Sequence, residues 1–355
     1  MGDPRFVGLT SRGAPRAGAG GHPCQGLYWT GDQPRPAVAV IASHYNVDFA
    51  EHYIAPYFAE RGFGFLGWNT RYRGAEDLFM LDQALADIGA GVRWLREVAG
   101  ARTVVLLGNS GGGSLMAAYQ AASLGDDALP GGDLYISLNA HPGRPEVLTA
   151  WLDPSVTDET DPLATDPALD AFDPRNGPPY APDFIARYRA AQVARNHRIS
   201  AWARAELARL NAAGVPDRIF PLFRTWADLR FMDPAIDPSE RPCPACYAGP
   251  PARANRQPVG LGRSNTLKTW LSMWSLEASA CRGAEQLAKL QLPALVVQSL
   301  ADTGVFPSDA QAVFEAVAAA DKTLKLVPGA HYFEDAPDRR AAVADLMAGW
   351  IRERL

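Results

Sequence analysis

One serine of this 355-residue chain stands where the sequence changes from a strand pattern to a helix pattern. The segment 104–116 reads VVLLGNSGGGSLM, and Ser110 lies in it between Gly108 and Gly112 in the spacing GxSxG. A turn this sharp strains the serine backbone, and its glycines are needed because side chains there would collide with the neighbouring strand or helix. We therefore expect an exposed Ser110 Oγ that can act as a nucleophile.

The same serine could instead cap a helix in a phosphate-binding loop. A dinucleotide-binding loop needs the spacing GxGxxG, whereas Gly111 and Gly113 are followed by Met116. The lysine of a P-loop is also missing from this segment. The nucleophile interpretation is therefore favoured.

A serine hydroxyl is a weak nucleophile at neutral pH, so a base must take its proton and an acid must orient that base. Asp302 follows the apolar run 293–300, and His331 follows the next one, 324–327. The order Ser, Asp, His, each at the carboxyl end of a strand, favours a catalytic triad. Singly, Asp302 could be a loop cap and His331 a structural histidine. The alternatives within the triad are Asp309 and Asp335 as acid and His141 as base.

Backbone N–H groups must stabilise the oxyanion that such a reaction forms. The N–H of Gly111, which opens the helix after Ser110, is the first expected donor. The second should come from the loop SHYNVDF, from Tyr45 or Asn46, and the sequence does not choose between them. His44 is expected to anchor this loop by hydrogen bonds.

Strand and helix patterns alternate on both sides of these residues, which predicts right-handed crossovers and a mostly parallel sheet covered on both faces. The strands are expected at 37–43, 63–68, 103–107, 134–138, 293–300 and 324–327. The helices are expected at 48–60, 81–98, 110–122, 308–319 and 339–354.

The alternation breaks in a long stretch crowded with Asp-Pro pairs, which contains one helical pattern over 182–213. The prediction is an α/β core of residues 27–141 and 265–355 with an inserted domain of residues 142–264. For residues 1–26, rich in Gly, Pro and Arg, a flexible segment is one alternative, and an ordered segment or one that docks on a neighbour is equally compatible with the sequence.

The motifs resemble those of the α/β-hydrolase superfamily over about residues 36–140 and 266–355. The resemblance rests on GNSGG around Ser110, on D-x-x-V from Asp302 to Val305, and on PGAH ending at His331. It implies a doubly wound α/β fold, a serine hydrolase without cofactor or metal, and a cap domain inserted between the sixth and seventh strands over the site. Many members have glycine after the histidine of the oxyanion loop, where this chain has Tyr45, so a bulky side chain is expected to shape the site.

Ester cleavage of a bulky, mainly apolar small molecule is the favoured reaction, and aromatic side chains of the insertion could line its pocket or form the insertion's own core. Those aromatic residues are Trp151, Phe223, Trp226 and Phe231 of the insertion, together with Trp270 and Trp274 just beyond it. The candidate substrate contacts are His44, Tyr45, Asn109, Trp226, Trp270, Trp274 and Tyr332.

Two other functions remain open. Carbon-carbon hydrolases resemble this chain in having asparagine before the serine, as Asn109 does, although many have tryptophan where Tyr332 stands. The fold can also serve as a non-catalytic ligand-binding protein, although such proteins frequently lose a triad member.

Charge and composition limit the classes of partner that this protein is expected to bind. The net charge of −5 is spread along the chain, so no basic face for nucleic acid is expected, and no apolar run is long enough for a membrane span. A small-molecule partner and a cytoplasmic location are expected, and a homodimer is compatible with the sequence. Only four of the 34 basic residues are lysine and the rest are arginine, which is typical of proteins encoded by GC-rich bacterial genomes. Cys243 and Cys246 are expected to form a tight turn with two thiols, without a metal.

Overall fold

The computed structural model describes residues 3–11 and 23–355 and divides the chain into two compact units. The first unit consists of Met1–Ala75, Leu81–Gly143 and Gly283–Leu355. The second consists of Glu76–Met80 and Arg144–Arg282. In the chain, the long segment of the second unit follows the sixth strand of the main sheet and precedes the seventh. The predicted insertion 142–264 covers most of it, and the unit also includes residues 265–282.

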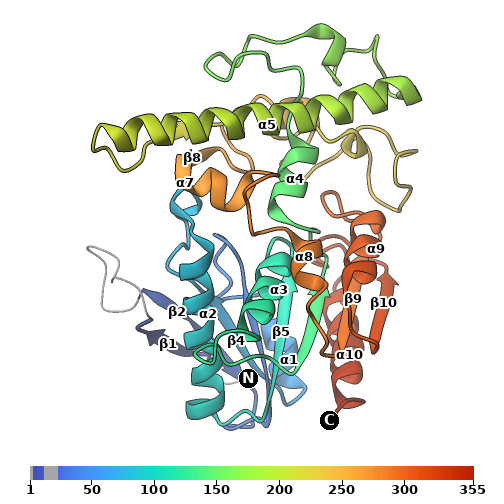
Figure 1. The fold of residues 1–355 in the computed structure, drawn as a ribbon. Helices are drawn as coiled ribbons and strands as arrows, with labels where there is room; N and C mark the ends of the chain where they lie inside the picture. The colour runs from blue at the N-terminus through green and yellow to red at the C-terminus, as the bar shows by residue number, and fades with distance from the viewer. Residues whose placement is uncertain (1–2, 12–22) are drawn as a thin grey trace. The chain divides into compact units, whose positions relative to one another are not determined.

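An eight-stranded sheet forms the centre of the first unit, in the order β1-β2-β4-β3-β5-β6-β9-β10 (Figure 1). The strands are β1 (Arg5–Leu9), β2 (Cys24–Thr30), β3 (Val38–Ser43), β4 (Gly64–Asn69), β5 (Thr103–Asn109), β6 (Leu134–Leu138), β9 (Ala294–Ser299) and β10 (Lys322–Val327). From β4 to β10 every neighbouring pair is parallel, which confirms the predicted mostly parallel sheet. Parallel pairing places the carboxyl ends of these strands at one edge, where the candidate residues follow them.

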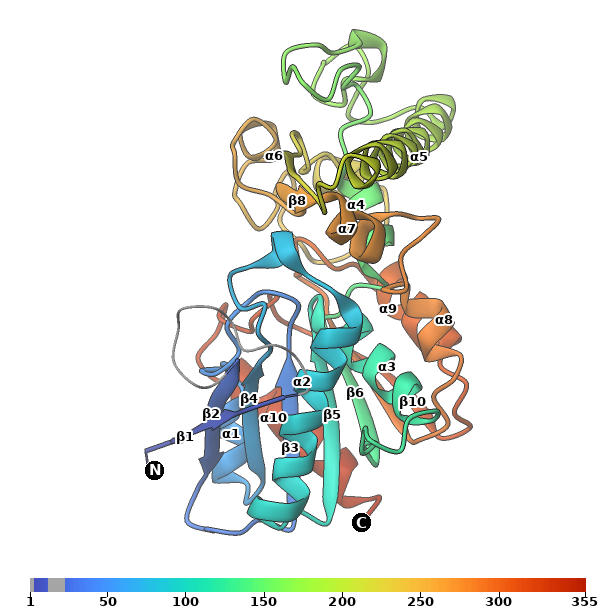
Figure 2. The ribbon, with the colours of Figure 1, turned by 60° about the vertical axis from the view of Figure 1, so that its left-hand side comes forward.

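Helices cover both faces of this sheet. The helices of this unit are α1 (Ala55–Glu60), α2 (Leu81–Trp94), α3 (Gly112–Ser123), α8 (Gly283–Leu287), α9 (Pro307–Ala316) and α10 (Arg339–Arg352). On one face, α1 and α10 pack against Val38, Val40 and Ala42 of β3 in a common apolar core. The other face carries Ile41, whose side chain lies against α2 at Gly91. Figure 2 shows α2 beside the strands of the sheet. The alternation of side chains along β3 thus supplies both layers.

The prediction of a helix at 48–60 is wrong for the first half of that range. The helix begins only at Ala55, with Pro56 in its first turn. Upstream, Asp48 Oδ1 accepts the backbone N–H of Ala50 at 2.9 Å, and Asn69 Oδ1 accepts that of Phe49 at 2.8 Å. Side chains of this kind compete with helical hydrogen bonds and favour turns.

Part of the segment 1–26, whose order the sequence left open, belongs to the sheet. Strand β1 pairs antiparallel with β2, and β2 pairs antiparallel with β4. The chain passes close to its neighbour there, since a Cβ on Gly26 would lie 1.9 Å from the carbonyl oxygen of Gly67. Residues 1–2 and 12–22 of that segment lie outside the described part of the chain.

Strand β10 ends the sheet in the described residues and pairs only with β9. It carries two of the four lysines of the chain, Lys322 and Lys325. Lys322 Nζ donates to the carbonyl oxygens of Phe314 and Val317 at the end of α9, at 3.0 and 2.7 Å. Lys325 is exposed to solvent.

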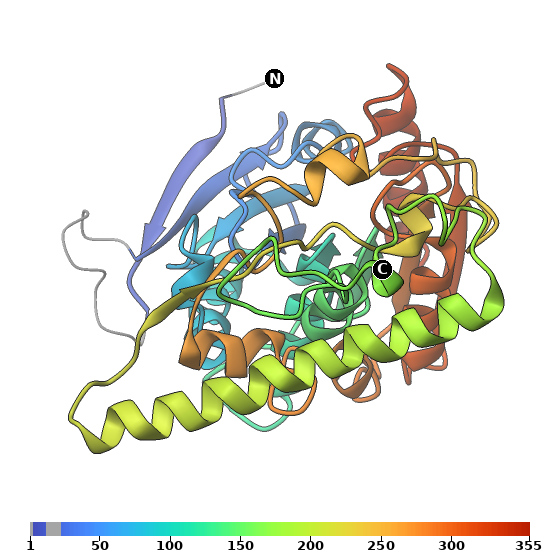
Figure 3. The same ribbon diagram turned by 90° about the horizontal axis from the view of Figure 1, so that it is seen from above.

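The second unit is built around one long helix, α5 (Pro182–Ala212), close to the predicted 182–213 and seen along its length in Figure 3. The other elements are α4 (Arg144–Trp151), α6 (Pro251–Ala254), α7 (Leu267–Thr269) and the antiparallel pair β7 (Ile219–Pro221) and β8 (Ser264–Thr266). Short 3-10 turns lie at Glu76–Leu78, Pro167–Leu169 and Leu229–Phe231. A π-helical turn follows α7 at Trp270–Trp274, and a similar turn in the first unit follows α2 at Leu95–Ala99.

Buried ion pairs hold this second unit together. The guanidinium of Arg195, completely buried in α5, donates to both carboxylate oxygens of Glu159 at 2.9 and 2.7 Å. The buried carboxylate of Asp228 receives hydrogen bonds from Arg189 at 2.7 Å and from Arg230 at 2.8 Å. Burial alone would raise the pKa of Asp228, but these two cations outweigh it and hold the pKa well below its usual range.

None of the helices in the described part of the chain combines the length and the apolar character that a membrane span requires.

Candidate active site

Ser110 occupies a sharp turn between β5 and α3. Its φ of 55° lies in the left-handed region, which is strained for a residue with a side chain. A Cβ on Gly108 would lie 2.4 Å from Gly113 Cα, and one on Gly112 would lie 2.3 Å from the carbonyl oxygen of Ser43. The close approaches explain why glycines flank this serine, as predicted from the sequence, and Ser110 itself stays half-buried.

An acid and a histidine meet after β9 and β10. Asp302 Oδ2 lies 2.6 Å from His331 Nδ1, and both side chains are buried. Asp302 Oδ1 accepts the backbone N–H groups of Gly304 at 2.8 Å and Val305 at 3.0 Å. Since a carboxylate can only accept, the hydrogen-bond network assigns the proton to Nδ1 and leaves the lone pair of Nε2 to act as a base.

The alternative residues have other hydrogen bonds. Asp309 Oδ2 accepts the backbone N–H of Phe306 at 3.0 Å at the start of α9. Asp335 Oδ1 accepts the N–H of Ala330 at 2.9 Å. The backbone N–H of His141 donates to the carbonyl oxygen of Ser110 at 3.1 Å. Of the three candidate acids, Asp302 is the one that the structure brings to the imidazole of His331.

The loop after β3 contains Tyr45 and Asn46, whose backbone N–H groups are the candidates for the second oxyanion donor. His44 Nδ1 accepts the N–H groups of Asn46 at 3.3 Å and Val47 at 3.2 Å, so this histidine folds the loop. The N–H of Asn46, one of the two predicted second oxyanion donors, makes that 3.3 Å contact, and these bonds do not choose between Tyr45 and Asn46. The Tyr45 side chain is fully buried, with its hydroxyl 3.0 Å from Ser114 Oγ of α3. It packs against the helix and forms no exposed wall, contrary to the expectation that it would shape the site.

Asn109 is fully buried and bonded within the core, which corrects its assignment as a substrate contact. Its Nδ2 donates to the carbonyl oxygen of Leu138 at 2.8 Å, and its Oδ1 lies 3.1 Å from His52 Nε2. Burial lowers the pKa of His52 to about 3, so its ring is neutral. Because His52 Nδ1 accepts the N–H of Ile54 at 3.3 Å, Nε2 carries the proton and donates it to Asn109.

Tyr332 is the predicted substrate contact that combines exposure with proximity to the base. Its side chain is 42% exposed, and its ring centre lies 4.5 Å from that of His331. The ring of Tyr53 packs against it edge to face at 5.5 Å. Burial of its inner part, followed by the negative charges of Asp302 and Glu334, raises the pKa of the Tyr332 hydroxyl. The hydroxyl therefore remains a hydrogen-bond donor at neutral pH.

Asn139 was not identified from the sequence, although it bonds to Ser110, to His331 and to the strand that precedes Asp302. It follows β6, is fully buried and has a φ of 43°. Its Nδ2 donates to the carbonyl oxygen of His331 at 2.8 Å, and its Oδ1 accepts the N–H of Ser299 at 2.7 Å. Its own carbonyl oxygen accepts the N–H of Ser110 at 3.1 Å. An asparagine directly after a short buried strand was the available sequence signal.

The three tryptophans predicted to contact substrate lie in the interior of the second unit. Trp226 Nε1 donates to the carbonyl oxygen of Val259 at 2.7 Å, and Trp270 Nε1 donates to Ser200 Oγ at 3.0 Å. Trp274 is completely buried beneath the guanidinium of Arg144, which lies 4.4 Å from the ring centre. The structure therefore places these three candidate substrate contacts in the core of the second unit, which is the interpretation that the sequence favoured for any single one of them.

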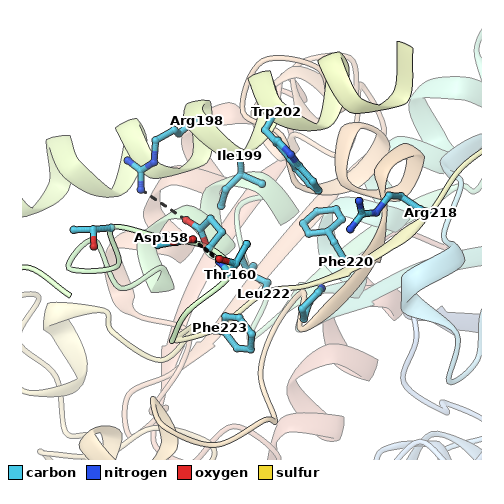
Figure 4. A pocket seen from close by; sticks show the side chains of 12 residues that line it. Asp158, Thr160, Arg198, Ile199, Trp202, Arg218, Phe220, Leu222 and Phe223 are labelled. Atoms are coloured by element: carbon cyan, nitrogen blue, oxygen red, sulfur yellow. Dashed lines mark hydrogen bonds and ion pairs between the residues drawn. The ribbon is translucent and has the colours of Figure 1, made fainter. Parts of the chain in front are cut away.

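A cavity of about 590 Å³ lies within the second unit (Figure 4). Ile199 and Trp202 of α5 face Phe220 and Leu222 across it, and Phe223 is the only predicted pocket residue in its lining. Its polar side chains are paired. Asp158 bonds to Thr160 and Glu159 to Arg198 within the lining, while Glu159 also pairs with Arg195 and Arg218 with Glu206 outside it. The surface that remains for contact is mainly apolar.

Cys243 and Cys246 form no disulfide. Their thiols donate to the carbonyl oxygens of Phe231 at 3.5 Å and Gly249 at 3.3 Å. Burial raises the pKa of the Cys246 thiol to about 11, which keeps it protonated and poorly nucleophilic. Among the residues that the structure describes, no group of three or more His, Cys, Asp or Glu is arranged to hold a metal ion.

No protein-family model matches the sequence, and a search of curated proteins finds no match. Solved structures are similar in fold. The esterase domain of a Rhodothermus marinus protein is 14% identical, covers 99% of this chain and 98% of its own, and gives a TM-score of 0.52. A soluble variant of monoglyceride lipase from Saccharomyces cerevisiae is 13% identical, covers 99% and 95%, and gives 0.53.

A third similar structure is the α/β-hydrolase GrgF from a Penicillium species. It is 12% identical, covers 99% of this chain and 96% of its own, and gives a TM-score of 0.53. The observed sheet agrees with the predicted doubly wound sheet. Its first two strands are antiparallel to their neighbours, and six parallel strands follow them. The chain therefore has the fold of the α/β-hydrolase superfamily.

Proposed function

We propose that the protein is a serine hydrolase that cleaves a carboxylic ester, with Ser110 as nucleophile, His331 as base and Asp302 as the orienting acid. One observation carries the proposal. The 2.6 Å bond between His331 and Asp302 forms at the sheet edge that also carries Ser110 in a left-handed turn. This combination of a strained serine and an oriented imidazole is the arrangement that acyl transfer requires.

In the proposed reaction, Ser110 Oγ attacks the ester carbonyl carbon and its proton passes to His331 Nε2. The buried carboxylate of Asp302 holds the imidazole and stabilises its protonated form. The oxyanion is stabilised by the N–H of Gly111, at the positive end of α3, and by that of Tyr45 or Asn46. His331 then gives the proton to the leaving alcohol, and water hydrolyses the acyl-enzyme by the reverse route.

The proposed substrate is a small molecule that is bulky and mainly apolar. Support comes from the half-exposed ring of Tyr332 beside His331, which offers an apolar face to a leaving group or acyl chain. An esterase domain and a monoglyceride lipase are among the proteins with similar folds, and both names describe ester hydrolases.

Carbon-carbon hydrolysis has no specific support in the structure. The sequence argument for it was Asn109, and the amide of that residue is bonded to Leu138 and His52 inside the core. The same amide therefore has a structural explanation that is independent of substrate.

The test is hydrolysis of p-nitrophenyl esters from acetate to long acyl chains by the wild type and by Ser110→Ala. We expect kcat to fall at least roughly a thousandfold in Ser110→Ala. A matched control is Ser123→Ala, since Ser123 lies at the far end of the same helix and donates to the carbonyl oxygen of Gln120 at 2.8 Å. Folded wild type that hydrolyses none of the esters would contradict ester hydrolysis, and a fully active Ser110→Ala would contradict the nucleophile.

A further inference from the structure

The hydrogen bonds of Asn139 reach the loops of the nucleophile and the base and the strand that leads to the acid. Its backbone oxygen accepts the N–H of Ser110, and its side-chain amide donates to the carbonyl oxygen of His331 at 2.8 Å. The amide oxygen accepts the N–H of Ser299, three residues before Asp302, at 2.7 Å. A displacement of this side chain would therefore disturb the loop of the base and the strand of the acid together.

Asparagine suits this position for two separate reasons. The backbone φ of 43° is in the left-handed region, which asparagine adopts more readily than most residues with a side chain. The side chain must donate to one backbone group and accept from another in a fully buried place, and a carboxamide presents both functions. Leucine would fill the volume but leave the carbonyl of His331 and the N–H of Ser299 without this partner.

We propose that Asn139 is a positioning residue, which sets the imidazole of His331 relative to Ser110 through the bonds to His331 and Ser299. The proposal rests on the proposed function. It requires no contact between Asn139 and substrate, so it concerns the turnover step more than binding. Loss of the side chain should therefore lower kcat and leave KM nearly unchanged.

The decisive variant is Asn139→Gly. Glycine adopts a φ of 43° without strain, so the backbone bonds to Ser110 and to Val297, the latter at 2.9 Å, are retained while both side-chain bonds are lost. We expect a fall in kcat of roughly 100-fold, the size associated with misplacement of a reacting group by about 1 Å. KM should stay within about twofold, because uniform binding is untouched.

A second variant separates positioning from general loss of stability. In Asn139→Asp, a protonated carboxyl group reproduces the donor and acceptor pattern of the amide, whereas the ionised form loses the donor to His331. The ratio of its kcat to that of the wild type should therefore be highest at low pH and fall as the pH rises. Taking the ratio at each pH removes the titration of groups that the two proteins share.

Gln120→Ala is the matched control, because Gln120 is a buried amide of the same unit that accepts the N–H of Gly132 at 2.8 Å near the far end of α3. Both Asn139→Gly and Gln120→Ala should lose stability in urea unfolding, and only Asn139→Gly should lose kcat. Equal kcat in these two variants, or a constant ratio for Asn139→Asp across pH, would overturn the positioning role. Wild type without ester turnover and without covalent labelling of Ser110 by a fluorophosphonate would instead overturn the proposed function, and this inference with it.

Discussion

The surroundings of Ser110 and the long helix of the second unit are held in different ways. Around Ser110, the order comes from close backbone approaches at glycines and from neutral hydrogen bonds of Asn109 and Asn139. In the second unit, buried arginines paired with carboxylates hold the long helix, as Arg195 does with Glu159. The neutral bonds fix positions without adding charge to the His331–Asp302 pair, whereas the ion pairs bind loops with little regular structure.

The largest effect in this comparison is expected at the serine turn. In Gly108→Ala, the new Cβ would lie 2.4 Å from the backbone of Gly113, which cannot rotate away. We expect a loss of about 3 kcal/mol or more in the free energy of unfolding, measured by urea denaturation, because this overpacking is against backbone.

The control is Gly125→Ala, since nothing lies within 4 Å of a Cβ at Gly125 at the other end of α3. If Gly108→Ala and Gly125→Ala were equally stable, the close approach would not be what requires glycine at the turn.

The second effect tests the ion pairs of the other unit. In Asp228→Asn, the guanidinium groups of Arg189 and Arg230 keep their charges and lose the carboxylate between them. Removing one partner of a buried pair is costly, and we expect the free energy of unfolding to fall by about 3 kcal/mol in urea denaturation.

Glu206→Gln provides the comparison, because the two partners of Glu206, Arg209 and Arg218, are 65% and 49% exposed to solvent. Surface pairs contribute little, so no measurable change is expected there. Equal losses in Asp228→Asn and Glu206→Gln would show that burial does not distinguish these pairs.

The smallest effect concerns pH and His52. The folded-state pKa of about 3 lies below the unfolded value of 6.5, so between these values the unfolded chain binds a proton that the folded chain does not. The free energy of unfolding therefore falls as the pH decreases through this window, by up to about 1.4 kcal/mol per pH unit from this group.

His52→Gln should make this dependence shallower by about 1 kcal/mol per pH unit, measured by urea unfolding from pH 6 to pH 4. Glutamine can still donate to Asn109, so the variant should fold at pH 7. A slope identical to that of the wild type would exclude His52 as the group responsible.

The sequence predicted the residues at the sheet edge better than their long-range contacts, because the patterns that determine the turn and the strands are local in the chain. The spacing around Ser110 predicts a turn within a few residues, and the apolar runs before Asp302 and His331 predict two strands. Asn139 escaped prediction because its partners lie far along the chain, at His331 and Ser299. Only the pairing of β6 with β9 and of β9 with β10 brings those loops together.

The second unit was harder to predict for a related reason. The single helix α5 was expected within one residue of its end, since its pattern is long and continuous. The partners of Arg195 and Asp228 come from irregular loops, which have no hydrophobic period to read. The tryptophans were likewise considered as substrate contacts because aromatic composition does not distinguish a core from a binding surface.

The lysines of β10 bear on how copies of this chain can meet. A final strand has one row of backbone N–H and C=O groups without a neighbouring strand, and such a row can recruit a strand from another molecule. Lys325 stands exposed on this strand, and edge-to-edge association would force its ammonium group against the incoming chain and out of water. An exposed lysine on the last strand therefore disfavours edge-to-edge association of two copies at β10.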